Sequence, residues 1–174
     1  MKINIHNIML GIIGLIVLAV TGCSSNPQQP EQFVAVPIPT VVEDGQLITL
    51  ANRAADMYGL DNQLFQALVT HESGWDPSAI SPKGARGLAQ IMPSTGMAEC
   101  GLEREVLLDA ELNLHCGAFY LSKLLQRFND VELALAAYNS GEGRVARLGH
   151  VPHIRETQRY VKRIMADWRG FNYD

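Results

Sequence analysis

A glutamate at the end of an apolar helical run is the residue in this chain best suited to acid–base chemistry. The run carries Leu64 and Leu68, leads into Glu72, and is ended by Gly74. A carboxylate in the last turn faces the negative end of the helix dipole, and Trp75 beside it can exclude water. Both effects raise the pKa of Glu72, and a glutamate still protonated near neutral pH can act as a general acid. The alternative is an ordinary surface glutamate at a helix end.

Motifs for several other chemistries are incomplete. His71 and Glu72 begin like the zinc-protease motif H-E-x-x-H, but a tryptophan occupies the place of the second histidine. His150 and His153 lack a clear third metal ligand, and the chain has neither a G-x-S-x-G motif nor a phosphate-binding loop. Glycosidases generally use two carboxylates, yet the nearby Asp76 lies in a turn sequence. The residues leave one candidate acid and imply no metal or organic cofactor.

The composition predicts one globular domain with extensions. The chain has 174 residues, and its 47% hydrophobic content is enough to bury a core. Its formal charge is −4, and only Lys2 among its 14 basic residues lies before residue 23, whereas all 18 acidic residues follow. A nucleic-acid-binding protein is expected to present a basic face. The charge balance therefore argues against a nucleic-acid partner.

The N-terminus is typical of an exported lipoprotein. Residues 8–20 form an uncharged apolar run that is too short to span a bilayer but suits a signal peptide. The sequence V-T-G-C that ends at Cys23 resembles a bacterial lipobox, which predicts a signal peptide over 1–22 and a lipid on Cys23. Ser24 after the cysteine points to the outer membrane. The alternatives are a cleaved secretory signal with an incidental cysteine, and an uncleaved anchor.

A tether is predicted over residues 23–45. The stretch 24–44 contains four prolines and few residues able to form a core. Fully extended, it could reach up to about 70 Å, which would let an anchored domain search the space near its membrane. Residues 34–42 are apolar enough to lie along the folded domain instead, and both arrangements remain open.

From residue 46 the hydrophobic spacing becomes helical. Apolar residues recur at helix spacing over 46–58, 61–72, 109–128, 131–138 and 157–168, and residues 94–100 suit a short helix. Gly59 provides a stop for the first of these helices, and Asp61 can cap the second. No convincing run has the alternation of a strand. The sequence therefore predicts an all-α domain over 46–170, with residues 77–90 as its main irregular piece.

Two cysteines remain once Cys23 is assigned to the lipid. In an exported protein, Cys100 and Cys116 are expected to form a disulfide. Closing such a loop stabilises a fold by about 3 kcal/mol in the chain-entropy model. The alternative is a pair of buried thiols. A catalytic cysteine is not indicated, because Cys116 falls on an apolar helix face.

Several motifs occur together in an order that resembles one known family. They are E-S-G at 72–74, S-P-x-G-A-x-G-L-x-Q-I-M-P at 81–93, A-Y-N-S-G at 137–141 and E-T-x-x-Y-V at 156–161. From about Leu47 to Trp168 the chain is similar to the soluble lytic transglycosylase family. The resemblance implies a helical, lysozyme-like fold with a long substrate cleft. It also implies cleavage of peptidoglycan between N-acetylmuramic acid and N-acetylglucosamine, leaving a 1,6-anhydro end.

The same resemblance implies roles for individual residues. Glu72 would donate a proton to the glycosidic oxygen and then accept one from the muramyl 6-hydroxyl, so a second carboxylate is not needed. The positions that match family cleft residues are Ser81, Gln90, Tyr138, Asn139 and Tyr160. Their structural alternatives are a turn serine, a loop-bracing amide, a core tyrosine and simple helix packing. The family often has methionine where this chain has Ala89, which predicts a weaker or differently shaped substrate contact beside Gln90.

The resulting prediction is a lipid-anchored lytic transglycosylase of the outer membrane that faces the periplasm and acts on peptidoglycan glycan strands. A hydrolytic, lysozyme-like muramidase is the alternative within the same fold. A peptidoglycan-binding module without turnover, or a structural accessory of an envelope-spanning secretion or conjugation machine, is the alternative from another class. Because the chain is acidic, its net charge offers no attraction to the carboxylates of peptidoglycan stem peptides, and we expect binding through cleft contacts.

Overall fold

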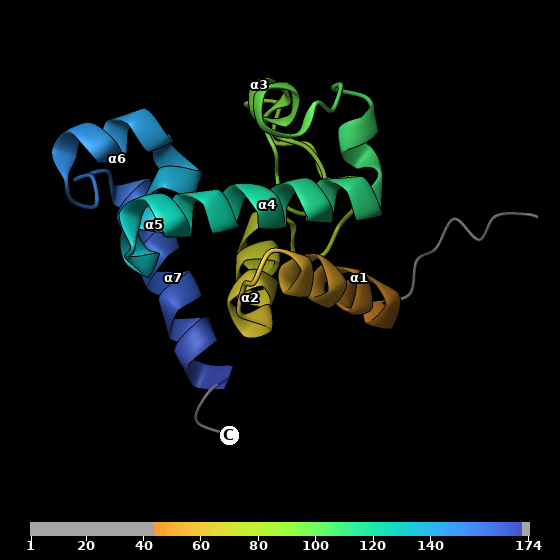
Figure 1. The fold of residues 1–174 in the computed structure, drawn as a ribbon, viewed down its shortest axis with the longest axis horizontal. Helices are drawn as coiled ribbons and strands as arrows, with labels where there is room; N and C mark the ends of the chain where they lie inside the picture. Colours follow the sequence, from red (N-terminus) through yellow and green to blue (C-terminus); the bar gives the residue numbers. More distant parts are fainter. Residues whose placement is uncertain (1–43, 172–174) are drawn as a thin grey trace, which may run out of the picture. The chain divides into compact units, whose positions relative to one another are not determined.

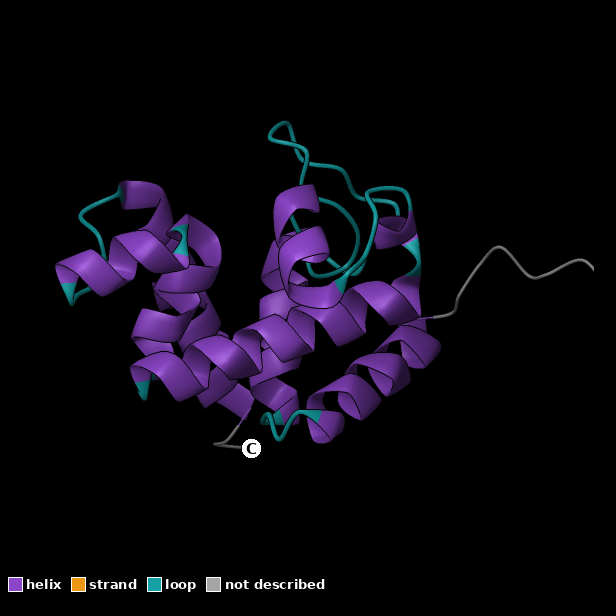
Figure 2. Ribbon diagram, turned by 45° about the horizontal axis from the view of Figure 1, so that its top comes forward, coloured by secondary structure: helices purple, strands orange, loops and turns teal. Residues whose placement is uncertain are grey.

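The computed structural model describes residues 44–171, and within this range the chain is helical with no β-strand (Figures 1 and 2). The elements are α1 Asp44–Met57, α2 Asn62–Ser73, α3 Pro93–Thr95, the π-helix η1 Gly96–Cys100, the 3-10 helix η2 Val106–Leu108, α4 Ala110–Phe128, α5 Val131–Ser140, α6 Glu142–Leu148 and α7 Arg155–Phe171. The predicted all-α class is confirmed. The expected signal peptide, the lipidation site Cys23 and residues 24–43 of the expected tether lie outside the described residues. Between residues 44 and 171, no helix combines the length and apolar character needed to cross a membrane.

Helix α4 is the central element of the core. It packs against α1 and α5, while α7 packs against α2 and α5 (Figure 1). Fully buried apolar side chains from four helices meet there. Burying one large apolar side chain stabilises a fold by about 1.5–3 kcal/mol. The buried residues include Phe65 and Leu68 of α2, Leu121 of α4, Leu135 of α5 and Ile164 of α7. This core holds α2 against α7, and α2 carries the candidate acid.

The apolar face of α2 determines where Glu72 points. Leu64 and Leu68 are four residues apart and both are buried, and Glu72 follows another four residues on, so all three share one face of the helix. That face is turned toward the core. Because Glu72 lies in the last turn, where the core ends, it is partly buried rather than enclosed.

Aspartate side chains begin three of the helices. Asp61, Asp109 and Asp130 each accept a hydrogen bond from the backbone N–H three residues later, at 2.9, 2.9 and 2.8 Å. Such a cap contributes typically about 1 kcal/mol by satisfying a donor that the helix leaves unpaired. The predicted cap at Asp61 is confirmed, and the caps are a local reason why predicted and observed helix starts agree closely.

Some helix boundaries differ from prediction. Helix α1 begins at Asp44, two residues before the predicted start of the domain, and α7 extends beyond the predicted 157–168 at both ends. Helix α6 was not predicted, because it has seven residues and Val145 is its only buried one, so it lacks a repeated apolar stripe. The predicted short helix at 94–100 is divided between α3 and the π-helix η1.

A buried asparagine that sequence analysis did not single out fastens the long loop between α2 and α3. Asn113 of α4 is fully buried, and its Nδ2 donates to the carbonyls of Arg86 and Leu107 at 2.9 and 2.8 Å. Its Oδ1 accepts the backbone N–H of Ala89 at 2.7 Å. Gly87 permits this close approach, since its φ is +71° and a Cβ there would lie 2.4 Å from the Leu107 carbonyl oxygen. The loop is thereby attached to α4.

The predicted disulfide between Cys100 and Cys116 is present in the structure, with the two Cα atoms 5.8 Å apart. It joins η1 to α4. Cys116 packs in a small apolar cluster with Ala89, Ile91 and Leu107, which belong to the same loop and to η2. The disulfide is therefore a second attachment of the segment between α2 and α4, and it lies close to the asparagine bonds.

Replacing Asn113 by alanine is expected to destabilise the fold by about 2–4 kcal/mol, because it leaves one N–H and one carbonyl of the loop and one carbonyl of η2 unsatisfied. Urea denaturation measures the change. The matched control is Glu111→Ala, an exposed position on the same helix, which should stay within about 0.5 kcal/mol of the wild type. Equal stabilities for the two variants would contradict the anchoring role of Asn113.

Candidate active site

Glu72 lies in the last turn of α2, as the sequence predicts. The helix ends at Gly74, which has a left-handed backbone with φ 60° and donates its N–H to the Thr70 carbonyl. Trp75 then also takes a positive φ of 70°, which is uncommon for a bulky residue. Two successive left-handed residues turn the chain sharply away from the helix axis. The carboxyl of Glu72 is therefore not covered by a further turn of its own helix.

Burial raises the pKa of the Glu72 carboxyl from 4.5 to about 7, and a hydrogen bond from Tyr160 offsets part of that rise. The Tyr160 hydroxyl donates to Glu72 Oε1 at 2.5 Å. The predicted direction of the pKa shift is confirmed. The indole of Trp75 donates to Thr70 Oγ1 at 3.0 Å and does not line the pocket that holds Glu72. At neutral pH the carboxyl is therefore poised to give and to take a proton.

A pocket of about 440 Å³ opens beside Glu72 between α2, α5 and α7. It is lined by His71, Glu72, Asn139, Glu156, Arg159, Tyr160 and Arg163. The structure thus brings Asn139 and Tyr160 together with Glu72, as predicted for cleft residues. Asn139 Oδ1 accepts a hydrogen bond from the buried Thr157 hydroxyl at 2.9 Å, which fixes the amide and leaves Nδ2 for a ligand.

Tyr138 lies near this pocket without lining it. Its hydroxyl donates to the carbonyl of Ala89 at 2.9 Å, and its ring packs on Tyr120 with centroids 5.4 Å apart. Burial raises the pKa of Tyr138 well above its usual value, and the charge of Glu72 raises it further. The tyrosine is therefore close enough to sense Glu72, but its polar atom holds the loop.

Gln90 and Ser81 also use their side chains on the loop. Gln90 has a positive φ of 46°, and its Nε2 donates to the carbonyls of Ala79 and Gly87 at 3.1 and 2.9 Å. Ser81 Oγ accepts the N–H of Ala85 at 3.0 Å in a tight turn. Neither residue lines the pocket around Glu72. Their geometry matches the alternatives of a loop-bracing amide and a turn serine. These bonds leave the Gln90 side-chain oxygen, and the proton and second lone pair of the Ser81 hydroxyl, for any substrate contact.

Ala89 does not face the pocket, contrary to the expectation of a changed substrate contact. It is fully buried, and its Cβ would lie 2.5 Å from a Cβ placed on Gly117 of α4. The residues that sequence reasoning missed are Asn113, Arg159 and Arg163. A polar residue on the apolar face of α4 could have pointed to Asn113. The two arginines gave no such signal, because exposed charges on a helix are ordinary.

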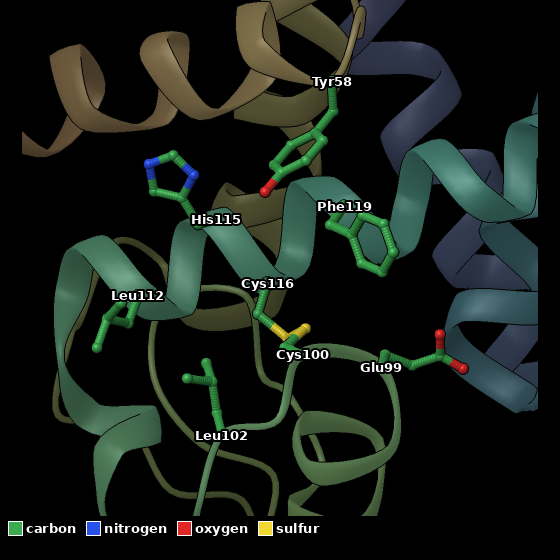
Figure 3. Close-up of a pocket in the computed structure, with 8 residues that line it drawn as sticks. All are labelled: Tyr58, Glu99, Cys100, Leu102, Leu112, His115, Cys116 and Phe119. Atoms are coloured by element: carbon green, nitrogen blue, oxygen red, sulfur yellow. A yellow bond between two sulfur atoms is a disulfide. The ribbon is translucent and has the colours of Figure 1, made fainter.

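A second pocket, of about 340 Å³, lies along α4 on apolar and aromatic side chains (Figure 3). Tyr58 contacts His115 and Phe119 edge-on, with ring centroids 6.1 and 5.6 Å apart. The Cys100–Cys116 disulfide forms part of its wall. The acid that lines this pocket, Glu99, is ion-paired with Lys123 at 2.8 Å, and the pocket shares no residue with the pocket around Glu72, so it is not part of the candidate active site.

Comparison with known proteins assigns the family. The profile of the transglycosylase SLT domain matches residues 49–161. This chain belongs to that family. The match covers α2 and α5 completely and α7 as far as Val161, so that Arg163 lies beyond it, and it confirms the resemblance found in the sequence motifs. The structural neighbours given below confirm the predicted lysozyme-like transglycosylase fold of the SLT domain.

The SLT domain is similar to proteins with lytic transglycosylase names. Membrane-bound lytic murein transglycosylase F of Desulfosudis oleivorans is 36% identical over 125 residues, covering 68% of this chain and 25% of that protein. The 70-kDa soluble lytic transglycosylase of Escherichia coli is 32% identical in structural alignment, with a TM-score of 0.65 over 72% of this chain and 24% of the other. Lytic transglycosylase Slt of Pseudomonas aeruginosa, solved as an inactive glutamate-to-glutamine mutant, is 29% identical, with a TM-score of 0.63 over 71% and 24%. The chain spans about a quarter of the length of these relatives.

Glu72 is expected to make the SLT domain less stable as the pH rises through 7. Its pKa in the folded state, about 7, lies above the 4.5 of an exposed glutamate, so its contribution to stability is complete below pH 4.5 and is lost as the pH passes 7. The full effect is about 3 kcal/mol. Urea denaturation at about pH 4.5 and 8.5 should show this loss in the wild type and not in Glu72→Gln. The exposed control Glu103→Gln should lose stability between the two pH values as the wild type does. If Glu72→Gln lost as much stability as the wild type, the raised pKa could not be assigned to Glu72.

Tyr160→Phe is expected to raise the pKa of Glu72 above 7, because it removes the hydrogen bond that favours the ionised carboxyl. A hydrogen bond to a charged group is worth roughly 1.5–3 kcal/mol, which corresponds to a rise of about one pH unit or more. Carbon-13 NMR of the Glu72 carboxyl across a pH series measures it. Tyr138→Phe is the control, since its hydroxyl binds Ala89 instead, and an equal rise in both variants would argue against a specific Tyr160 contact.

Proposed function

We propose that this SLT domain cleaves peptidoglycan glycan strands between N-acetylmuramic acid and N-acetylglucosamine without water, and that Glu72 is its single acid and base. The observation that carries the proposal is the partly buried Glu72 carboxyl with a pKa of about 7, hydrogen-bonded to Tyr160 in a pocket. Family membership and the word "murein" in the names of relatives support the substrate class. The inactive glutamate-to-glutamine mutant of the Pseudomonas neighbour supports a glutamate acid.

The proposed reaction uses one carboxyl group twice, first as an acid and then as a base. Protonated Glu72 gives its proton to the glycosidic oxygen as the bond between that oxygen and C1 of the muramyl residue breaks. The resulting carboxylate accepts the proton of the muramyl 6-hydroxyl while O6 bonds to C1, which yields the 1,6-anhydro end. Tyr160 stabilises the carboxylate between the two steps. Asn139 Nδ2 is free to donate to a sugar oxygen, and the N-acetyl group of the substrate stabilises the developing cation.

A hydrolytic muramidase is the second candidate, because one further carboxylate, Glu156, lines the pocket. Its side chain is 69% exposed and lies 3.7 Å from the Lys83 ammonium. A solvated, ion-paired carboxylate is a weaker candidate for activating water or attacking C1 than a desolvated one. The geometry therefore favours the single-glutamate reaction.

The location follows from the N-terminal sequence and the relatives. We propose a lipid on Cys23, a tether over the residues before Asp44, and a catalytic domain that faces the periplasm from the outer membrane of a Gram-negative bacterium. Relatives named membrane-bound lytic murein transglycosylase support an envelope location. A role as a peptidoglycan-binding accessory of an envelope-spanning machine remains the alternative from another class, and it would not need Glu72.

Mass analysis of the muropeptides released from purified sacculi tests the reaction. The wild type and Glu156→Gln are expected to release 1,6-anhydro products, whereas Glu72→Gln should lose activity by about 100-fold or more, as for removal of a general acid. Reducing ends from the wild type, abolished in Glu156→Gln, would establish the muramidase. Binding to sacculi without release of either product would establish the accessory role.

A further inference from the structure

Two arginines of α7 lie in the wall of the pocket that contains Glu72. Arg159 and Arg163 are four residues apart, so they occupy the same face of the helix, one turn from each other. Both side chains are exposed. Within residues 44–171, neither arginine forms a hydrogen bond or an ion pair.

The acidic residues that could neutralise these arginines are engaged elsewhere. Glu156, one turn before Arg159, lies 3.7 Å from Lys83 of the loop. Asp167, one turn after Arg163, accepts from His71 Nε2 at 2.6 Å. Neither guanidinium therefore has an ion-pair partner among residues 44–171, and the pocket wall combines these two arginines with the carboxyl groups of Glu72 and Glu156, although the chain as a whole has a net charge of −4.

The arginines do not serve the candidate acid. A guanidinium in contact with Glu72 would favour its ionised form and lower its pKa. Burial raises that pKa instead, and the hydrogen bond that opposes the rise comes from Tyr160. The two positive charges are therefore available to a ligand in the pocket.

The chemistry of the proposed substrate identifies the ligand. The sugar rings and N-acetyl groups of the glycan are uncharged, whereas the stem peptides attached to the muramyl residues carry carboxylates. Guanidinium groups recognise carboxylates through paired, directional hydrogen bonds. We propose that Arg159 and Arg163 form a subsite for a stem-peptide carboxylate and make the domain prefer peptide-bearing strands over bare glycan. This inference rests on the proposed function, and it adds to the expected cleft contacts a local attraction that the net charge of the chain does not predict.

Turnover on two forms of one substrate tests the subsite. The substrates are solubilised peptide-bearing strands and the same strands after an amidase has removed the peptides. In Arg159→Gln/Arg163→Gln, kcat/KM on peptide-bearing strands is expected to fall about 10-fold, since each tenfold step corresponds to about 1.4 kcal/mol and one charge-assisted hydrogen bond can supply it. On bare glycan, kcat/KM should stay within about twofold, because no carboxylate is present to lose. The control Arg155→Gln/Lys162→Gln makes the same charge change on exposed residues of α7 that do not line this pocket, and it should match the wild type on both substrates.

Equal losses on both substrates, or equal losses in the control, would overturn the subsite in favour of a structural or a general charge effect. A binding measurement separates this inference from the proposed reaction. Soluble muramyl tripeptide, with free or amidated carboxyl groups, is titrated into Glu72→Gln and followed by NMR. The subsite is supported if the amidated form binds more weakly than the free form, and if the free form binds more weakly once Arg159→Gln and Arg163→Gln are added to the Glu72→Gln protein. This result would hold even if no anhydro product is ever found. Equal binding in all cases refutes it.

Discussion

The site depends on how far Glu72 is removed from water. Helical spacing places it on the stripe of α2 that buries Leu64 and Leu68, while the end of the helix leaves it at the margin of the core. Complete burial would hold the proton too strongly for release, and full exposure would leave the carboxyl ionised at neutral pH. The Tyr160 hydroxyl, contributed by α7, moderates the effect of burial. The packing of α7 on α2 therefore sets the acid–base behaviour of the pocket.

Residues of the family motifs fall into two groups in this structure. Some line the pocket around Glu72, and others use their polar atoms to hold the loop between α2 and α3. Gln90, Ser81 and Tyr138 belong to the family motifs, yet their polar atoms bind backbone groups of the loop. The backbone of this loop forms only isolated β-bridges and turns, and side chains satisfy several of its other N–H and carbonyl groups. Asn113 and the disulfide at Cys116 complete this attachment from α4. Much of the motif is therefore explained by the need to hold one shape.

Net charge describes the whole chain and not the charges that line the pocket. The chain is acidic, but Glu156 and Asp167 lie next to Lys83 and His71, and the pocket wall beside Glu72 holds Arg159 and Arg163 without ion-pair partners. Electrostatic interactions between exposed groups are screened over a distance of about 8 Å in physiological salt. A ligand in the pocket thus responds to the nearest uncompensated charges, and the total over the chain matters little to it.

Sequence patterns were sufficient to predict the all-α class, most helix bounds, the Asp61 cap, the disulfide pair, the family, and Glu72 as a candidate acid with a raised pKa. These follow from helical spacing, caps and turn residues, which act over a few neighbouring positions, and from motifs. The tertiary structure was needed to show that Tyr160, 88 residues from Glu72, is its hydrogen-bond partner. It also showed that the Trp75 indole binds Thr70, and that Asn113 binds a loop residue 24 positions away. Sequence spacing carries no information about such pairs, because the packing of separate helices brings them together. The unpaired state of the two arginines has the same origin, since it depends on which partners the neighbouring acids find in the folded chain.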